Sequence, residues 1–320
     1  MGPPYGVAAD ALGNIYFSDH VRNRVRMVTV ATGVITTVAG NGLCAFSGDG
    51  GPASSAALCA PAYLHVDASG NIYIADNGNS RVRKITKSTG IITTVAGTGG
   101  IGYNGDGRLA TDSGIYKGFG IAVDIPGNIY ICDTLENRVR KVTKSTGIIS
   151  TIAGIGGINN GGFAGDGGLA ALAQLNLPHA VAVDALGNVF FTDTNNNRVR
   201  MVSVTTGIIT TVVGGGTLPL TIGGPGVPMA SVNLGPTGGI SLDAAGNMFL
   251  ALFYSGAILK VTKSSGLVTV VAGTLTRGFS GDGGPATSAK MGYPIDVVVD
   301  TFGNIHFSDY IYDRIRTVKA

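Results

Sequence analysis

The sequence is poor in the side chains that most catalytic and membrane proteins need. Only 13% of its 320 residues are charged, Trp is absent, and a single Glu accompanies four His. No apolar run approaches the roughly 18 residues of a membrane-spanning helix, so we expect no membrane span. The net charge is only +3, and the Lys and Arg residues are not clustered as on nucleic-acid-binding surfaces. We therefore expect no nucleic-acid partner and no cofactor.

Cysteine is also scarce, with three residues that lack the spacing of metal ligands. Cys132 stands where the other copies of the repeat described below have small residues, so we expect it to be buried. Cys44 and Cys59 flank one Gly-rich segment, where either a disulfide or two free thiols is compatible with the sequence. The scarcity of charge and the abundance of Thr, Ser and Gly favour a secreted or cell-surface location, although the localisation remains unknown.

What the sequence does contain is a repeat with a fixed period. The pattern Asp-x-x-Gly-Asn occurs six times at intervals of 57 to 60 residues. The Asp residues that open the copies are Asp10, Asp67, Asp124, Asp184, Asp243 and Asp300. Self-similarity at such a period is typical of architectures built from stacked structural units.

Each repeat predicts four short strands. In the second unit these are LHVD (64–67), IYIAD (72–76), RVRKIT (81–86) and IITTVAG (91–97), bounded by Gly, Asn, Asp or Ser. Segments of this length that are rich in Val, Ile, Thr and Tyr indicate strands joined by tight turns. One such sheet cannot bury both faces alone, so the copies must stack. Six four-stranded antiparallel sheets around an axis form an all-β, six-bladed β-propeller.

A second repeated phrase follows the fourth strand and leads into the next unit. It reads FSGDGGPA (46–53), YNGDGRLA (103–110), FAGDGGLA (163–170) and FSGDGGPA (279–286), and it has decayed to IGGPGVPMA at 222–230. We interpret residues 1–320 as one domain. Its approximate repeats are 1–57, 58–114, 115–174, 175–233, 234–290 and 291–320.

The sixth repeat ends at its third strand, residues 314–319. The last blade should therefore lack its outer strand. An exposed edge of this kind is a template on which another strand can add.

Three phrases carry a resemblance to a known family. GNIYIAD followed by NSRVRKI (70–76 and 79–85), GIITTVAG (90–97) and the GDGGPA linker resemble the NHL-repeat family of six-bladed propellers. The resemblance covers almost the whole chain and implies the fold. It leaves the function open, because propellers serve as enzymes, receptors and scaffolds alike.

Most of the acidic side chains have a structural explanation in the repeat. The Asp that closes each second strand precedes an Arg by five residues, which predicts an ion pair across the hairpin. The predicted pairs are Asp19–Arg24, Asp76–Arg81, Asp133–Arg138, Asp193–Arg198 and Asp309–Arg314. The fifth repeat has Leu252 and Ala257 instead, so both partners are lost together. The alternative is that these arginines bind an anion.

A few residues differ between the repeats at equivalent positions, and these are the candidates for function. The linkers and the turns after the second strands lie on one face of a propeller. This places Tyr5, His20, Phe119, His179 and Asp296 around one mouth of the axial channel. We predict a non-enzymatic scaffold that binds a protein, peptide or glycan there.

Two other functions stay open. The first is a metal-dependent enzyme of the lyase or lactonase kind, in which His65, His179 and Asp296 hold a divalent metal. The second is an RNA-binding propeller, for which Arg108 and Arg277 are the thin support. Metal analysis of the purified protein would distinguish the first of these functions from the scaffold.

Overall fold

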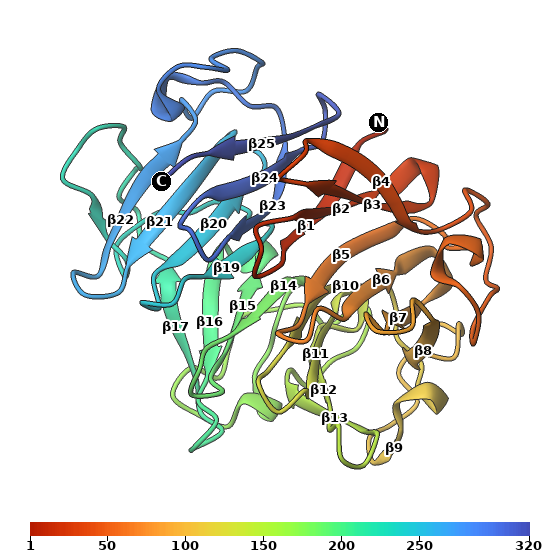
Figure 1. Ribbon diagram of the computed structural model, residues 1–320. Coiled ribbons are helices and arrows are strands. Elements are labelled where there is room, and N and C mark those ends of the chain that lie inside the picture. The colour runs from red at the N-terminus through yellow and green to blue at the C-terminus, as the bar shows by residue number, and fades with distance from the viewer.

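Six small antiparallel sheets surround a central axis (Figure 1). The computed structural model describes residues 1–320 apart from the side chain of Phe119. Each sheet is formed by consecutive strands of one repeat, with the first strand nearest the axis. The predicted six-bladed β-propeller is therefore confirmed.

The strand boundaries follow the repeat closely. The first blade contains β1 (Pro4–Ala9), β2 (Ile15–Asp19), β3 (Arg24–Thr29) and β4 (Val34–Ala39). The second contains β5 (Pro61–Val66), β6 (Ile72–Asp76), β7 (Arg81–Ile85) and β8 (Ile92–Ala96). The third contains β10 (Gly118–Val123), β11 (Ile129–Asp133), β12 (Arg138–Val142) and β13 (Ile148–Ala153). The fourth contains β14 (Pro178–Val183), β15 (Val189–Asp193), β16 (Arg198–Val202) and β17 (Ile209–Gly214).

The last two blades depart slightly from this pattern. The fifth contains β19 (Ile240–Leu242), β20 (Met248–Leu252), β21 (Ala257–Thr262) and β22 (Leu267–Ala272). The sixth contains β23 (Pro294–Val299), β24 (Ile305–Asp309) and β25 (Arg314–Val318). Among the described residues no fourth strand pairs with β25, which confirms the predicted three-stranded blade.

Single-turn 3₁₀ helices occupy the turns and linkers. They are η1 (His20–Arg22), η2 (Ala53–Ser55), η3 (Asn77–Asn79), η4 (Ala110–Asp112), η5 (Thr134–Glu136), η6 (Ala170–Leu172), η7 (Thr194–Asn196) and η8 (Ala286–Ser288). The linkers also carry two short strands, β9 (Arg108–Leu109) and β18 (Val227–Pro228), which pair with β13 and β22. The linkers that lead into the second to fifth blades thus cross the outer strand of the blade that they enter.

The Asp-x-x-Gly-Asn repeat builds the turn between the first two strands. In the first copy, Asp10 Oδ1 accepts hydrogen bonds from the backbone N–H groups of Leu12 (3.0 Å) and Asn14 (2.8 Å). The side chain of Asn14 then accepts the N–H of Val30, beyond the third strand, at 3.2 Å. The motif therefore joins two hairpins of one blade, which explains its recurrence without a catalytic role.

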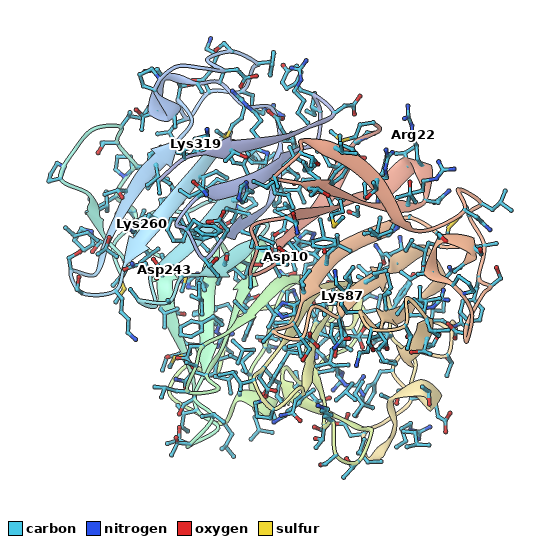
Figure 2. All side chains as sticks on the ribbon, viewed as in Figure 1. Asp10, Arg22, Lys87, Asp243, Lys260 and Lys319 are labelled. Carbon is cyan, nitrogen blue, oxygen red and sulfur yellow. A yellow bond between two sulfur atoms is a disulfide. The ribbon has the colours of Figure 1, made fainter. Side chains whose placement is uncertain are left out.

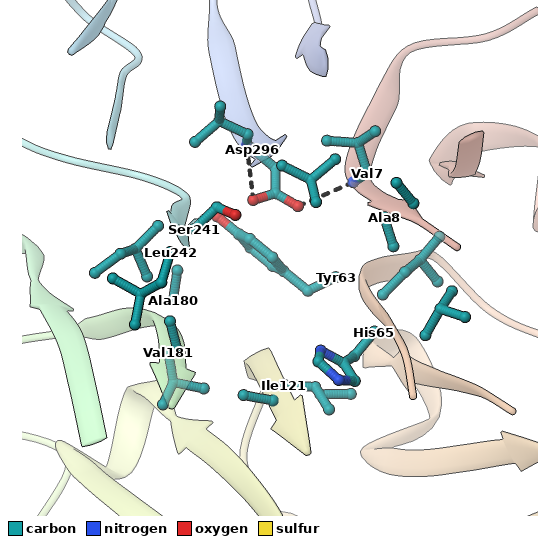
Figure 3. A pocket seen from close by; sticks show the side chains of 18 of the residues that line it. Val7, Ala8, Tyr63, His65, Ile121, Ala180, Val181, Ser241, Leu242 and Asp296 are labelled. Carbon is teal, nitrogen blue, oxygen red and sulfur yellow. Dashed lines mark hydrogen bonds between the residues drawn. The ribbon is translucent and has the colours of Figure 1, made fainter. Parts of the chain in front are cut away.

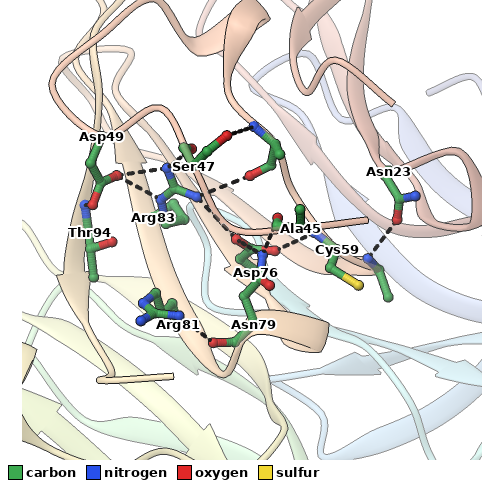
Figure 4. A network of polar contacts seen from close by, with 12 residues as sticks. Asn23, Ala45, Ser47, Asp49, Cys59, Asp76, Asn79, Arg81, Arg83 and Thr94 are labelled. Atoms are coloured by element: carbon green, nitrogen blue, oxygen red, sulfur yellow. Dashed lines mark hydrogen bonds and ion pairs between the residues drawn. The ribbon is translucent and has the colours of Figure 1, made fainter. Parts of the chain in front are cut away.

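The predicted Asp–Arg pairs are wrong by two residues (Figure 4). Asp76 lies directly opposite Arg81 in the β6–β7 ladder, but its carboxylate pairs with Arg83, at 3.2 Å from Nη1. Residues of the preceding linker determine which of the two arginines pairs with Asp76. Asp49 of the linker lies 2.7 Å from Nη2 of Arg83, whereas Phe46 of the linker lies under the guanidinium of Arg81, 3.7 Å from its Cζ.

The same exchange occurs in the other blades. The observed pairs are Arg26–Asp19, Arg140–Asp133, Arg200–Asp193 and Arg316–Asp309. The arginines predicted to pair, Arg138, Arg198 and Arg314, stack instead on Tyr103, Phe163 and Phe279 of the linkers.

The fifth blade replaces the whole arrangement with apolar residues. Leu252 and Leu259 stand where the other blades have the strand Asp and the paired Arg, and both are buried. Its linker has Pro225 where the other linkers have Asp. The three charged groups are lost together because a buried charge without its partner is costly.

Cys44 and Cys59 form a disulfide across the first linker, with Cα atoms 4.1 Å apart. This resolves the alternative that the sequence leaves open. Cys132 is a free thiol and is fully buried, as predicted.

Charged side chains are spread over the molecule. The cations labelled in Figure 2, Arg22, Lys87, Lys260 and Lys319, belong to four different blades. No described helix is long and apolar enough to cross a membrane.

Candidate functional site

The axial channel is lined by the inner strands of all six blades (Figure 3). Its cavity is about 220 Å³, and its wall is mostly aliphatic, with Val7, Ile121 and Val181 among the lining residues. Tyr63, His65, Ser241 and Asp296 add the polar groups. The residues that break the repeat therefore gather in this channel and at its mouth.

Tyr63 and Asp296 occupy one repeat position that is otherwise reserved for very small residues. The equivalent residues are Gly6, Gly120, Ala180 and Gly239. A Cβ at Gly6 would lie 2.7 Å from the Cα of Tyr63, and a Cβ at Gly239 would lie 2.6 Å from the Cα of Asp296. At both positions a glycine in the preceding blade lets the two inner strands approach closely, as Gly120 does beside Ala180.

Asp296 is buried among backbone donors. Its Oδ2 accepts the N–H of Val7 at 2.9 Å, and its Oδ1 accepts the N–H of Val297 at 2.9 Å. Burial raises the pKa of this carboxyl to about 8, and the two backbone hydrogen bonds only partly oppose the effect. Burial therefore favours the protonated form of the Asp296 carboxyl.

His179 lies between two tyrosine hydroxyls. Its Nε2 is 3.1 Å from Oη of Tyr5, and its Nδ1 is 3.0 Å from Oη of Tyr63. Tyr63 Oη also lies 3.3 Å from the carbonyl oxygen of Ile295, which can only accept. If Tyr63 donates to Ile295, it accepts from Nδ1–H of His179, and Nε2 accepts from Tyr5. A neutral imidazole satisfies this chain, and burial lowers the pKa of His179 to about 4.

An aromatic cluster continues from this chain onto the mouth of the channel. The Tyr5 ring lies 5.1 Å from that of His20 and 6.1 Å from that of Tyr310, between centroids. On the other side, Phe253 lies 6.4 Å from His179 and 5.9 Å from Tyr293. Tyr254 is the most exposed member, at 54%, and lies 4.6 Å from Phe253. We call this set the mouth cluster; its members are Tyr5, His20, Tyr63, His179, Phe253, Tyr254, Tyr293 and Tyr310.

Four of the five candidate site residues meet here. Tyr5 contacts both His20 and His179, and the nearby Asp296 contributes to the raised pKa of Tyr5. His20 also ties two blades together, because its Nδ1 lies 3.0 Å from the carbonyl oxygen of Pro61. Phe119 is the fifth candidate, and its side chain lies outside the described part of the chain.

Five members of the mouth cluster were not predicted from the sequence. Tyr63 could have been found because it replaces Gly or Ala. Phe253 and Tyr310 share the repeat position of His20, where the second, third and fourth blades have Asn77, Thr134 and Thr194. Tyr254 follows Phe253 in the chain, and Tyr293 directly precedes β23. The aromatic residues thus come from the fifth, sixth, first and second blades together with His179 of the fourth.

His65 lies deeper in the channel than the mouth cluster. Figure 3 shows Tyr63 extending between Asp296 and His65. Burial lowers the pKa of His65 to about 4. In the part of the chain that the structure describes, no three His, Cys, Asp or Glu residues are grouped so that they could hold a metal ion. His65, His179 and Asp296, the metal ligands of the alternative enzyme function, are therefore not assembled as a metal site in this conformation.

Comparisons with known proteins agree with this architecture. Residues 159–280 match the family model described as the teneurin NHL domain. Human teneurin-1 is 26% identical over 294 aligned residues, which cover 80% of this chain and 10% of that protein. The chain thus spans about a tenth of the length of this relative.

Solved structures with similar folds are more distant in sequence. A Bacteroides thetaiotaomicron protein of unknown function has a TM-score of 0.70 at 17% identity, with 99% of this chain and 69% of the other covered. Virginiamycin B lyase from Staphylococcus aureus has a TM-score of 0.55 at 15% identity, with 100% and 85% covered. These likenesses show the fold alone.

Proposed function

We propose that this chain, an NHL-repeat six-bladed β-propeller, is a non-enzymatic binding module that recognises a protein partner through its mouth cluster. A peptide or a glycan is the other ligand class that such an aromatic surface accepts. The fold supports this reading because the repeat itself uses most of the acidic side chains for structure.

The mouth cluster is the observation that carries the proposal. Repeat packing does not require aromatic side chains there, since other blades have Asn or Thr at the position of Phe253 and Tyr310, and Ala, Lys or Leu at the position of Tyr293. Tyrosine offers a large, rigid apolar surface together with a hydroxyl, and it is enriched in protein interfaces and their energetic hot spots. Tyr254 is 54% exposed and its neighbours Phe253 and Tyr293 are half-buried, so the outer part of the cluster is accessible.

The disulfide favours an extracytoplasmic location for this module. Structural disulfides such as Cys44–Cys59 persist in oxidising compartments and are rare in the cytosol. A secreted or cell-surface scaffold would use the rigid ring to present the mouth cluster to its partner.

A metal-dependent lyase or lactonase is the competing function. It requires His179 to exchange its tyrosine partners for a metal and Asp296 to lose its proton. Tightly bound, stoichiometric zinc in the purified protein would support the enzyme and contradict the scaffold.

Selection from a random peptide display library, with an oligosaccharide array in parallel, tests the binding proposal. Ligands selected on the unmodified protein should lose about tenfold or more in affinity for Tyr254→Ser/Tyr293→Ser. Phe302→Ser is the matched control, because Phe302 is 63% exposed in the turn at the opposite end of the sixth inner strand. Ligands that bind the double variant unchanged would place recognition elsewhere.

A further inference from the structure

A groove runs along the outer edge of the sixth blade. Its volume is about 610 Å³. One wall is the edge strand β25 together with Lys319, which follows it, and the other is the preceding linker at Gly281–Gly284 and Ala286. Met291 and Phe307 form part of its lining. The groove therefore lies where the outer strand of a four-stranded blade would stand.

In the second blade, the corresponding space holds the outer strand β8. There Gly50 N–H donates to the carbonyl oxygen of Ile92 at 2.9 Å, and Ile92 N–H donates to that of Gly51 at 3.0 Å. Asp49 Oδ2 accepts the N–H of Thr94 at 3.1 Å. An outer strand is thus bonded on both sides, by its own blade and by the linker.

The sixth blade keeps the linker half of this arrangement. Gly283, Gly284 and Asp282 stand where the second blade has Gly50, Gly51 and Asp49. The Asp282 side chain is 61% exposed, whereas that of Asp49 is 36% exposed. The difference follows because Asp49 is partly covered by the strand that it binds.

The first blade has a second uncovered surface, on its outer strand β4. Ile35 is 46% exposed, whereas the equivalent Ile92 of the second blade is 0% exposed. In the second blade a linker covers this position, as the hydrogen bonds of Gly50 and Gly51 show. No described linker crosses β4.

The polar groups of the first blade also lack the carboxylate that a linker supplies. Arg83 has two carboxylates, Asp76 and Asp49, at 3.2 and 2.7 Å. The equivalent Arg26 has only Asp19, at 3.7 Å. Among the described residues, Nε of Arg26 and Oδ2 of Asp19 are buried without a hydrogen-bond partner.

We propose that one polypeptide segment, with the fourth-strand phrase and the linker phrase of this repeat, binds both surfaces. Its strand, aliphatic and Thr-rich, fills the groove beside β25. Its Gly-rich continuation crosses β4, where an aromatic ring stacks on Arg24 and a carboxylate pairs with Arg26. The linkers into the second to fifth blades run from the outer strand of one blade across the outer strand of the next. A segment that leaves the groove beside β25 would cross β4 in the same way. Such a segment runs toward Met1, at the amino end of β1.

This inference is independent of the mouth cluster. It adds a second interaction surface at the side of the ring and states the sequence that the surface accepts. Pairing of β25 with the same edge of a second copy is the competing occupant. That arrangement would leave Ile35 and Arg26 uncovered, because it supplies no linker.

A synthetic peptide with the sequence of residues 90–115 is the probe. It contains the strand phrase followed by Tyr103 and Asp106. Calorimetry with the full chain should give one peptide per protein. Amide exchange should slow in β25 and in β4. The peptide carrying T93P should not bind, since proline removes a ladder N–H.

A double-mutant cycle tests the predicted ion pair. The D106N peptide should bind the unmodified protein about tenfold more weakly, but should bind R26L as the unmodified peptide does. R22L, which removes an exposed arginine from the same blade, is the control and should bind normally. The R26L protein should remain folded because Leu259 occupies the equivalent position of the fifth blade.

Three results would overturn the proposal. They are absence of binding by the 90–115 peptide, binding that leaves β25 unprotected, and dimerisation through β25 without peptide. If the free peptide aggregates, the same segment fused ahead of Met1 gives the answer. The fusion should raise the unfolding midpoint, whereas its T93P version should not, and an equal effect of both would contradict the proposal.

Discussion

Asp76 and Arg83 form an ion pair inside the second blade, with 3.2 Å between Oδ2 and Nη1 and both side chains 0% exposed. Burial raises the pKa of the Asp76 carboxyl, while the Asn79 side chain, the Cys59 N–H and Arg83 act against it. The pair is the counterpart of Leu252 and Leu259 in the fifth blade.

Arg83→Leu should therefore destabilise the fold by about 3–5 kcal/mol, because it leaves Asp76 buried without its cation. Combining it with Asp76→Leu, which copies the fifth blade, should cost less than the sum of the single changes. Arg81→Leu is the control and should cost only about 1 kcal/mol, from the lost stacking on Phe46. Urea unfolding measures the free energy of unfolding of these four variants and of the unmodified protein. A larger cost for Arg81→Leu than for Arg83→Leu would restore the pairing that the sequence predicts.

The protonated Asp296 should make stability depend on pH. Its folded pKa of about 8 exceeds the ordinary value of 3.8. Between these two values the unfolded chain loses the proton first, so rising pH favours unfolding. The native state should lose stability progressively from about pH 4 to about pH 8, by more than about 1 kcal/mol from this group.

Asp296→Asn keeps the shape of the side chain but cannot ionise. Urea unfolding from pH 5 to pH 8 should show that the variant gains stability relative to the unmodified protein as the pH rises. The comparison is needed because Asp133, whose pKa burial raises to about 7, titrates in the same range in both proteins. Parallel pH profiles would contradict a neutral Asp296.

The disulfide should contribute to stability through the first linker. Cys44 and Cys59 are separated by 15 residues, and closing a loop of that size stabilises a fold by about 3 kcal/mol. Cys59→Ser should lower the unfolding midpoint, and the variant should no longer respond to reductant. Cys132→Ala, which leaves the disulfide intact, should keep that response. A reductant effect that persists in Cys59→Ser would rule out this bridge.

The sequence predicted the fold because every level of the repeat agrees. The strand phrases, the Asp-x-x-Gly-Asn turns and the missing outer strand of the sixth blade all correspond to observed elements. The predicted partners of the ion pairs were wrong because the prediction considered only residues of the hairpin. Asp76 does lie opposite Arg81 in the ladder. However, Asp49, a linker residue distant in sequence, pairs with Arg83 and holds its guanidinium beside Asp76.

The candidate site was predicted only in part, for a similar reason. Tyr5, His20, His179 and Asp296 were found because they vary between repeats, and the structure places them together. Tyr63 was missed although it replaces a glycine. The significance of this replacement becomes clear only from the structure, where Gly6 packs against the backbone of Tyr63. Contacts between blades, rather than the repeat itself, build the mouth cluster, and those of His179 with Tyr5 and Tyr63 cross the axis of the ring.

Amide exchange of the protein in complex with a ligand selected from the peptide library tests the central claim most directly. Binding at the mouth cluster should slow exchange at residues 253–255, 292–295 and 309–312, and leave the turns at 10–14 and 124–128 unchanged. Protection confined to those turns, which lie at the opposite ends of the inner strands, would contradict the proposed binding face.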